Sequence, residues 1–182
     1  MLRSSRMILK EGGSTTFSLL VTRMGFKKIE DVRTSASTGD RVTTTWEIDN
    51  GLKIVFTSDK LSKSEYVQVF GDESESVSGV AETLGELGTY GYEDLLHAYR
   101  AASSIEEKSL SLIRIGVGAP PTADDEFCDC IIDALKSQES DLRKAGLWGA
   151  SFYAMRKFIP FIQEIVHAET DEDLKETAGA DA

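Results

Sequence analysis

The sequence predicts an α+β protein with an N-terminal helix and a three-stranded antiparallel meander, followed by a C-terminal stack of antiparallel helix pairs. Three observations indicate this class. β-Branched residues surround an Asn-Gly pair at 50–51, helical spacing replaces strand alternation after Asp72, and Pro120-Pro121 separates two helical segments. We expect an α/β cap with a β-hairpin meander over residues 1–72. A helical-repeat region over 73–182 would share one core with it.

The first predicted element is a helix within residues 15–33, with Gly25 as a weak point or break. Its apolar residues recur at spacings close to the helical period. They are Phe17, Leu20, Val21, Met24, Ile29 and Val32. A strand over "TFSLLVT" is the alternative. The segment "TSASTGD", residues 34–40, is rich in small and polar residues and is predicted to be a loop.

The meander follows that loop. Antiparallel strands are predicted near 42–49 and 52–58, joined at Asn50–Gly51, because both positions of such a turn favour positive φ. A third strand is predicted near 65–70. In it Tyr66 and Phe70 share one face, and Val67 and Val69 share the other. Three strands need a cover for their apolar face, and the flanking helices are the candidates.

Helical spacing then dominates the chain. The predicted helical segments are 75–88, 92–103, 106–118, 124–137, 140–158 and 159–169. Pro120 and Pro121 end one helix, and Thr122 or Asp124 can cap the next. Pro160 fits the first turn of the last helix, where its missing N–H costs nothing.

Two short segments of the helical part look alike: "SDLRKAG" and "EDLKETAG". Asp141-Leu142-Arg143 in the first corresponds to Asp173-Leu174-Lys175 in the second. Together with the preceding helix, "IIDALKSQESDLRKAGLWGAS" resembles a HEAT-type helical repeat, and a degenerate form of the pattern covers about residues 91–179. The resemblance implies an α-solenoid with a concave binding surface. In such a repeat Asp141 would cap the second helix, and Leu142 would lie between the helices.

The charge of −11 is unevenly distributed. Residues 1–60 have ten Lys and Arg against seven Asp and Glu, whereas residues 61–182 have ten against twenty-four. An acidic surface disfavours nucleic acid and membrane, which are polyanionic, and suits a basic protein partner. Simple solubility is the alternative. The spacing of Cys128 and Cys130 would strain a disulfide, and no long apolar run is present, so we expect a cytoplasmic protein.

No residue pattern predicts catalysis. The motifs of metalloproteases, serine hydrolases and P-loop enzymes are missing from the sequence. His97 and His167 belong to different predicted helix pairs, which makes a shared metal ion difficult. The carboxylates between Asp124 and Asp133 could bind a divalent cation, but an acidic helix start explains them more simply. We name no catalytic residue, cofactor or metal ligand.

The sequence therefore predicts a non-enzymatic protein–protein interaction module, with an acidic immunity- or antitoxin-like inhibitor of a basic protein as one form. The partner-binding residues are predicted to be Asp133, Glu139, Glu169 and Glu172, near helix ends and turns. One alternative is a cofactor-handling or lyase-like HEAT protein, which would use His97 or the Cys128–Cys130 pair. A subunit of a larger assembly is another.

Overall fold

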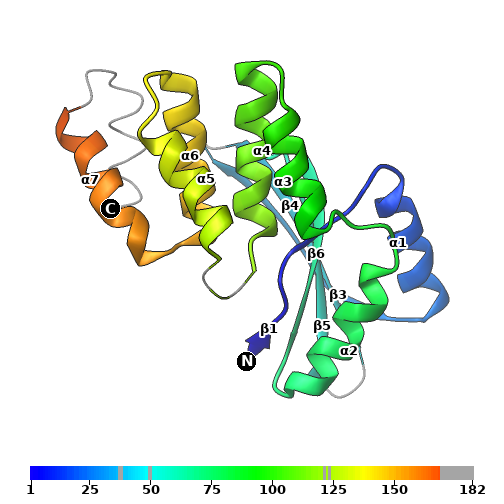
Figure 1. Ribbon diagram of the computed structural model, residues 1–182. Coiled ribbons are helices and arrows are strands. Elements are labelled where there is room, and N and C mark those ends of the chain that lie inside the picture. The colour runs from blue at the N-terminus through cyan, green and yellow to red at the C-terminus, as the bar shows by residue number, and fades with distance from the viewer. Residues whose placement is uncertain (37–38, 49–50, 121, 123, 169–182) are drawn as a thin grey trace. The chain divides into compact units, whose positions relative to one another are not determined.

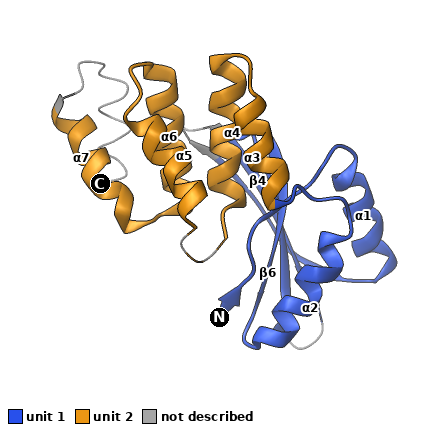
Figure 2. Cartoon of the chain, in the orientation of Figure 1, with its two compact units in different colours: residues 1–91 blue, residues 92–182 orange. Residues whose placement is uncertain are grey.

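The structure, a computed structural model, describes residues 1–36, 39–48, 51–120, 122 and 124–168 (Figure 1). The chain divides into two compact units, residues 1–91 and 92–182 (Figure 2). The first unit holds a sheet and two helices, and the second is helical. Helix α2 (Ser74–Gly85), which the prediction grouped with the helical region, belongs to the first unit.

One antiparallel sheet of six strands forms the first unit. The strands are β1 (Leu2–Arg3), β2 (Met7–Ile8), β3 (Lys27–Ala36), β4 (Gly39–Glu47), β5 (Lys53–Asp59) and β6 (Ser64–Gly71). Their order is β1-β6-β5-β4-β3, and β2 also pairs with β6. Thr57 in the middle of β5 lies between Thr43 of β4 and Tyr66 of β6. The fold class α+β is therefore confirmed, and β4, β5 and β6 form the predicted meander.

Helices α1 (Gly13–Arg23) and α2 pack on one face of this sheet and complete a hydrophobic core. Its buried members come from both helices, from the sheet and from the segments beside them: Leu9, Phe17, Val21, Leu52, Ile54, Val67, Val69, Val77 and Leu84. Phe17 packs edge-on against Trp46 at 5.3 Å and stacks on Phe56 at 5.6 Å between ring centroids. Burying one such aromatic side chain contributes about 1.5–3 kcal/mol.

Backbone hydrogen bonds close the first unit beyond α2. The amide of Lys10 donates to the carbonyl of Gly88, and the amide of Tyr90 donates to the carbonyl of Ile8, both at 2.8 Å. These bonds attach the segment after α2 to the N-terminal part of the same unit. They explain why the unit extends to residue 91.

The predicted helix over 15–33 is only partly correct. Helix α1 ends at Arg23, Gly25 takes a positive φ of 66°, and residues 27–36 form strand β3 instead. Much of the predicted loop over 34–40 belongs to β3 and β4. With β3 and the N-terminal strands β1 and β2, the sheet has six strands rather than three. Every described side chain from Lys27 to Thr34 is exposed, so this strand lacks the apolar alternation that marks a half-buried strand.

The predicted hairpin is confirmed in its strands. Glu47 lies opposite Lys53, and the amide of Ile48 donates to the carbonyl of Leu52 at 2.8 Å. Gly51 has a φ of 76°, which glycine adopts without steric cost. Asn50 lies outside the described residues.

Asp59 closes the turn between β5 and β6. One carboxylate oxygen accepts the backbone amides of Leu61 and Ser62 at 2.9 and 3.1 Å. The other accepts two N–H groups of Arg41 at 3.0 and 2.8 Å. The Asp59 side chain is only 3% exposed, so this carboxylate is both buried and fully hydrogen-bonded.

The second unit consists of helices α3 (Tyr92–Ala101), α4 (Ile105–Gly118), α5 (Asp125–Leu135), α6 (Ser140–Tyr153) and α7 (Ile159–Ala168), with a 3₁₀ turn at Arg156–Phe158. Ser104 caps α4, and Asp124 caps α5 as predicted. Pro160 lies in the first turn of α7, also as predicted. Within the described residues, no helix is long and apolar enough to cross a membrane.

Glycines bring three of these helices into close contact. A Cβ on Gly116 of α4 would lie 2.4 Å from the carbonyl oxygen and 2.6 Å from the Cα of Gly149 of α6. A Cβ on Gly146 would lie 3.1 Å from the Leu135 backbone nitrogen in α5. Glycine is therefore required where α4 meets α6, because any side chain there would push the two backbones apart.

The helical spacing predicts one core made of Leu135, Leu142, Leu147, Ile162 and Val166, and the structure shows it in part. Leu135, Leu147 and Ile162 are buried, whereas Leu142 and Val166 are half-buried. Helices α5 and α6 pack together, as expected for the two helices of a predicted antiparallel pair.

The HEAT-like α-solenoid is not confirmed, because the details that should repeat do not. In the predicted repeat Leu96 and Ile132 are equivalent, 36 positions apart, but Leu96 is fully buried and Ile132 is half-buried. Leu135 and Val166 are equivalent at a distance of 31 positions, but Leu135 is buried and Val166 is half-buried. Asp141 does not cap α6, because the helix begins one residue earlier and its N-cap position makes no side-chain bond. The second helix of the predicted third copy lies outside the described residues.

Candidate functional site

The structure places two of the four predicted partner-binding residues. Asp133 lies in the last turn of α5 and is exposed. Glu139 immediately precedes α6 and is also exposed. Glu169 and Glu172 lie outside the described residues. The candidate site is therefore the exposed face of α5 and the link that joins it to α6.

Three carboxylates four residues apart form an acidic stripe on α5: Asp125, Asp129 and Asp133. This spacing places them on one face of the helix, and all three are exposed. The opposite face packs into the unit through Phe127, Cys128, Ile131, Ala134 and Leu135, all buried. The stripe is thus carried by a helix whose position is fixed by its apolar face.

The first turn of α5 is held by neighbouring side chains. Asp125 pairs with Lys157 at 3.1 Å, and Glu126 pairs with Arg100 at 3.4 Å. A hydrogen bond with the Cys128 thiol and one with Asp125 raise the pKa of Lys157. Lys157 therefore stays charged at neutral pH and neutralises the N-terminal end of the stripe.

Two tyrosines fix the start of α5. The Tyr92 hydroxyl lies 3.1 Å from Asp124 and 2.8 Å from Glu126, and its ring stacks on Phe127 at 4.8 Å. Partial burial, followed by these hydrogen bonds to carboxylates, raises the pKa of Tyr92. The Tyr153 hydroxyl of α6 accepts the Asp124 amide at 2.8 Å and donates to the Thr122 carbonyl at 2.9 Å. The helix start is therefore rigidly placed.

The other two carboxylates of the stripe, Asp129 and Asp133, differ from Asp125 in their contacts. No hydrogen bond or ion pair of the Asp129 or Asp133 side chain occurs among the residues that the structure describes. They are like charges at a spacing of four, which destabilises a helix by about 0.2–0.5 kcal/mol. The two carboxylates therefore do not stabilise α5, and both are available to a cationic group of another molecule.

The groups beside the stripe are not nucleophilic. Burial first, and then the nearby carboxylates, raise the pKa of Cys130 and keep its thiol protonated at neutral pH. Burial, Cys130 and Asp133 raise the pKa of Tyr99 to about 12. This surface can attract and hold a cation, but the described residues around it do not form a nucleophile and base pair.

The other candidates from the sequence do not converge. His97 lies on α3, and His167 lies on α7, where its Nδ1 is 2.6 Å from the Gln163 carbonyl. Among the described residues, no three His, Cys, Asp or Glu side chains are arranged to hold a metal ion.

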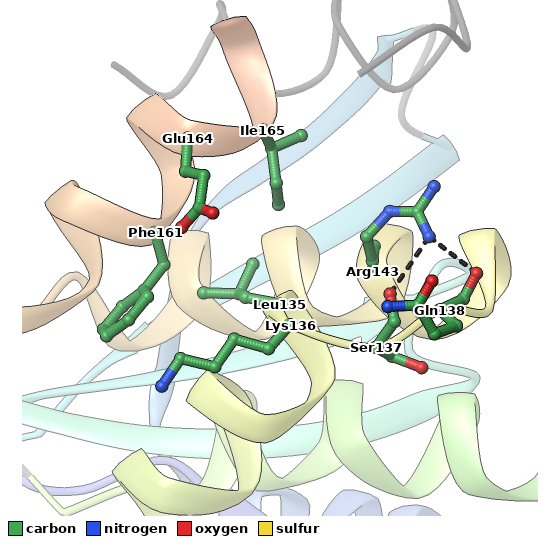
Figure 3. Close-up of a pocket in the computed structure, with 8 residues that line it drawn as sticks. All are labelled: Leu135, Lys136, Ser137, Gln138, Arg143, Phe161, Glu164 and Ile165. Carbon is green, nitrogen blue, oxygen red and sulfur yellow. Dashed lines mark hydrogen bonds between the residues drawn. The ribbon is translucent and has the colours of Figure 1, made fainter. Parts of the chain in front are cut away.

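A groove near the end of the stripe was not predicted. It has a volume of about 360 Å³ and is lined by Leu135, Lys136, Ser137, Gln138, Arg143, Phe161, Glu164 and Ile165, from α5, α6, α7 and the link (Figure 3). Arg143 donates to the carbonyls of Ser137 and Gln138 at 3.0 and 2.9 Å, so its guanidinium helps to hold the link. The Lys136 ammonium lies 4.5 Å from the centre of the Phe161 ring. The groove thus continues the link surface, and both polar and apolar side chains line it.

No pattern in the sequence predicts this groove. Lys136 and Phe161 are separated by 25 positions and meet only because α7 packs against α5. Arg143 could have been suspected, since it follows a polar link and a cation near a helix C-terminus binds free carbonyls.

Comparison with known proteins finds no match to any family model, curated protein or solved structure. The prediction of a HEAT family member is therefore wrong. The short charged turn between two helices imitated the repeat, and the six-stranded sheet was not anticipated.

Proposed function

We propose that this protein is a non-enzymatic binding module that docks a basic protein on the acidic stripe of α5. Asp129 and Asp133 are the main contacts, and Glu139 extends the surface along the link to α6. The observation that carries the proposal is the pair of exposed, like-charged carboxylates without an internal partner among the described residues. A cationic partner would relieve the repulsion between them.

The electrostatic field of the second unit supports this surface as a first point of contact. Residues 92–182 carry nine Lys and Arg against eighteen Asp and Glu, whereas residues 1–91 carry eleven against thirteen. Clustered charge of one sign raises the association rate with an oppositely charged protein, by about 10- to 1,000-fold in favourable cases. A partner would thus be drawn to the second unit before short-range contacts form.

The geometry also suits a rigid inhibitor. The start of α5 is fixed by the hydrogen bonds of Tyr92 and Tyr153, so the stripe needs little ordering when a partner binds. A small acidic protein of this kind can cover the cationic substrate-binding surface of an enzyme. The immunity- or antitoxin-like role is this specific form of the proposal, and loss of the partner's activity in the complex is its test.

The experiment compares three forms of the protein as affinity baits in extracts of the native host. The test variant is Asp129→Lys with Asp133→Lys. The matched control is Glu82→Lys with Glu86→Lys, two exposed carboxylates at the same spacing of four at the end of α2. Quantitative mass spectrometry identifies proteins bound by each form.

We expect a basic protein that binds the wild type and the control and is lost from the test variant. The same protein bound equally by all three forms would refute docking on the stripe. If no protein distinguishes the wild type from the test variant, the proposal is also refuted, and the stripe serves solubility.

A further inference from the structure

Strand β3 is an uncovered edge of the sheet. In the described part of the chain, β3 pairs only with β4, so its other edge presents backbone N–H and C=O groups without a strand partner. All described side chains from Lys27 to Thr34 are exposed. Ile29 and Val32 are 40% and 41% exposed, unusual for β-branched residues of a ten-residue strand. This edge is long enough to accept another strand.

The beginning of β3 is protected against pairing. A β-bulge interrupts its register with β4 between Lys28 and Glu30, and Lys28 forms an ion pair with Asp31. Bulges and lysines are common devices that prevent edge-to-edge association. The five residues after the bulge, 30–34, are regularly paired with β4 and have no such interruption. We call residues 30–34 the edge segment.

The edge segment is complementary to itself. When two copies run antiparallel with Val32 opposite Val32, Asp31 of each lies opposite Arg33 of the other, and Glu30 lies opposite Thr34. The pairing also respects the faces of the sheet. Glu30, Val32 and Thr34 alternate with Asp31 and Arg33 along the strand, so each pair meets on one face.

We propose that two copies of this protein associate through antiparallel pairing of their β3 edge segments, with Val32 at the two-fold axis. The contact joins two six-stranded sheets into one continuous sheet. Its symmetry is isologous, so each favourable pair occurs twice. This interface lies in the first unit and does not depend on the function proposed for α5.

The charges favour a second copy as the occupant. The guanidinium of Arg33 has no hydrogen bond or ion pair among the described residues, and Asp31 is its counter-charge in the facing strand. Hydrogen bonds from Lys28 and Thr44 lower the pKa of Asp31, so this carboxylate is ionised at neutral pH. A strand from another protein would need the same alternation of acid, apolar residue and base, which this chain already has.

Sedimentation velocity over a range of protein concentrations tests the proposal. The wild type should shift reversibly from its 20.0 kDa monomer to a dimer of twice that mass. Arg33→Asp places Asp31 opposite an acid in both pairs. The association constant should fall by about 10- to 100-fold, because opposite charges across strands are replaced by like charges.

A variant in which the charges of residues 31 and 33 are exchanged is the decisive test. Asp31→Arg with Arg33→Asp restores opposite charges only when each residue faces the other across a two-fold axis, so dimerisation should return. Arg156→Asp, at an exposed arginine of the second unit, is the control for net charge and should leave dimerisation unchanged. Val32→Lys is an independent probe, since it places two ammonium groups at the axis and should also give a monomer.

Circular dichroism confirms that each variant is folded before it is scored. A wild type that stays monomeric at all concentrations would overturn the proposal. So would a dimer unaffected by both Arg33→Asp and Val32→Lys. A dimer weakened by Arg33→Asp but not restored by the swap would overturn the pairing with Val32 at its centre.

Discussion

The contact between α4 and α6 gives the sharpest prediction about stability. Gly116→Ala adds one methyl group at the point where these two helices are closest. Helix propensity alone predicts a gain of about 1 kcal/mol, because alanine is the better helix former. The structure predicts the opposite sign, since the new Cβ would lie 2.4 Å from the Gly149 carbonyl oxygen and 2.6 Å from its Cα.

The magnitude follows from what the methyl group meets. Carbon atoms pack best at about 3.5–4.0 Å, so the helices must separate by about 1 Å. Both contacting atoms belong to the backbone, and no side-chain rotation relieves them. Overpacking costs about 1–3 kcal/mol, and we expect the upper end here. After the gain in helix propensity, the net loss is about 2 kcal/mol, a roughly 30-fold change in the unfolding equilibrium.

Chemical denaturation measures this loss. The protein has two tryptophans, Trp46 in the first unit and Trp148 in α6, so a Trp46→Phe background leaves fluorescence that reports the second unit alone. Gly79→Ala in α2 is the matched control, because nothing lies within 4 Å of its added Cβ and it should stabilise by about 0.5–1 kcal/mol. Because Gly79 lies in the first unit, unfolding of this control is followed by Trp46 fluorescence in protein that keeps Trp46. Stabilisation by Gly116→Ala would refute the close approach of the two helices.

Three further changes test other parts of the fold. Asp59→Ala should destabilise the first unit by about 2–4 kcal/mol, because it removes a buried, fully hydrogen-bonded carboxylate. Asp40→Ala removes only a surface ion pair with Lys60 and should cost less than about 1 kcal/mol. Equal losses of stability in urea unfolding would contradict this. Ala154→Gly should stabilise by about 1 kcal/mol in the same assay, because residue 154 ends α6 with a φ of 50° that glycine adopts more easily, and a loss would argue against this cap. The backbone amide and then the hydroxyl of Ser103 lower the pKa of Glu107 from its ordinary 4.5, so the stability from this carboxylate is present above that pH and is lost as the pH falls through the lowered value. Unfolding of Glu107→Gln should therefore depend less on pH in this acidic range than unfolding of the wild type, and identical pH profiles would show that the bond contributes nothing.

The sequence was informative where β-branched residues recur between turn signals. The meander over β4, β5 and β6 could be predicted because such residues are frequent in these strands and the Asn50–Gly51 turn signal separates two of them. Strand β3 could not, because its exposed side chains carry no period-2 pattern and Ile29 and Val32 also fit a helix. Edge strands are selected for charge and against regular apolar faces, so periodicity is weakest there.

The candidate site was predictable in its charge but not in its detail. Asp133 and Glu139 are exposed, as predicted for acidic residues near helix ends, and their role in binding stays a prediction. Asp129 was interpreted as part of an acidic helix start, a role that belongs to Asp124 and its neighbours. The difference depends on Lys157, which pairs with Asp125 from 32 positions away, whereas Asp129 and Asp133 form no ion pair among the residues that the structure describes. Such long-range pairing is set by tertiary packing.

We propose that the acidic stripe of α5 steers and holds a basic partner. The most direct test is the association rate with the protein captured by the wild type, measured at about 0.1 M and about 1 M salt, where the Debye length falls from about 10 Å to about 3 Å. The rate should drop steeply with salt for the wild type and for Glu82→Lys with Glu86→Lys. It should be low at both salt concentrations for Asp129→Lys with Asp133→Lys. A rate that responds neither to salt nor to reversal of the stripe would refute electrostatic steering by α5.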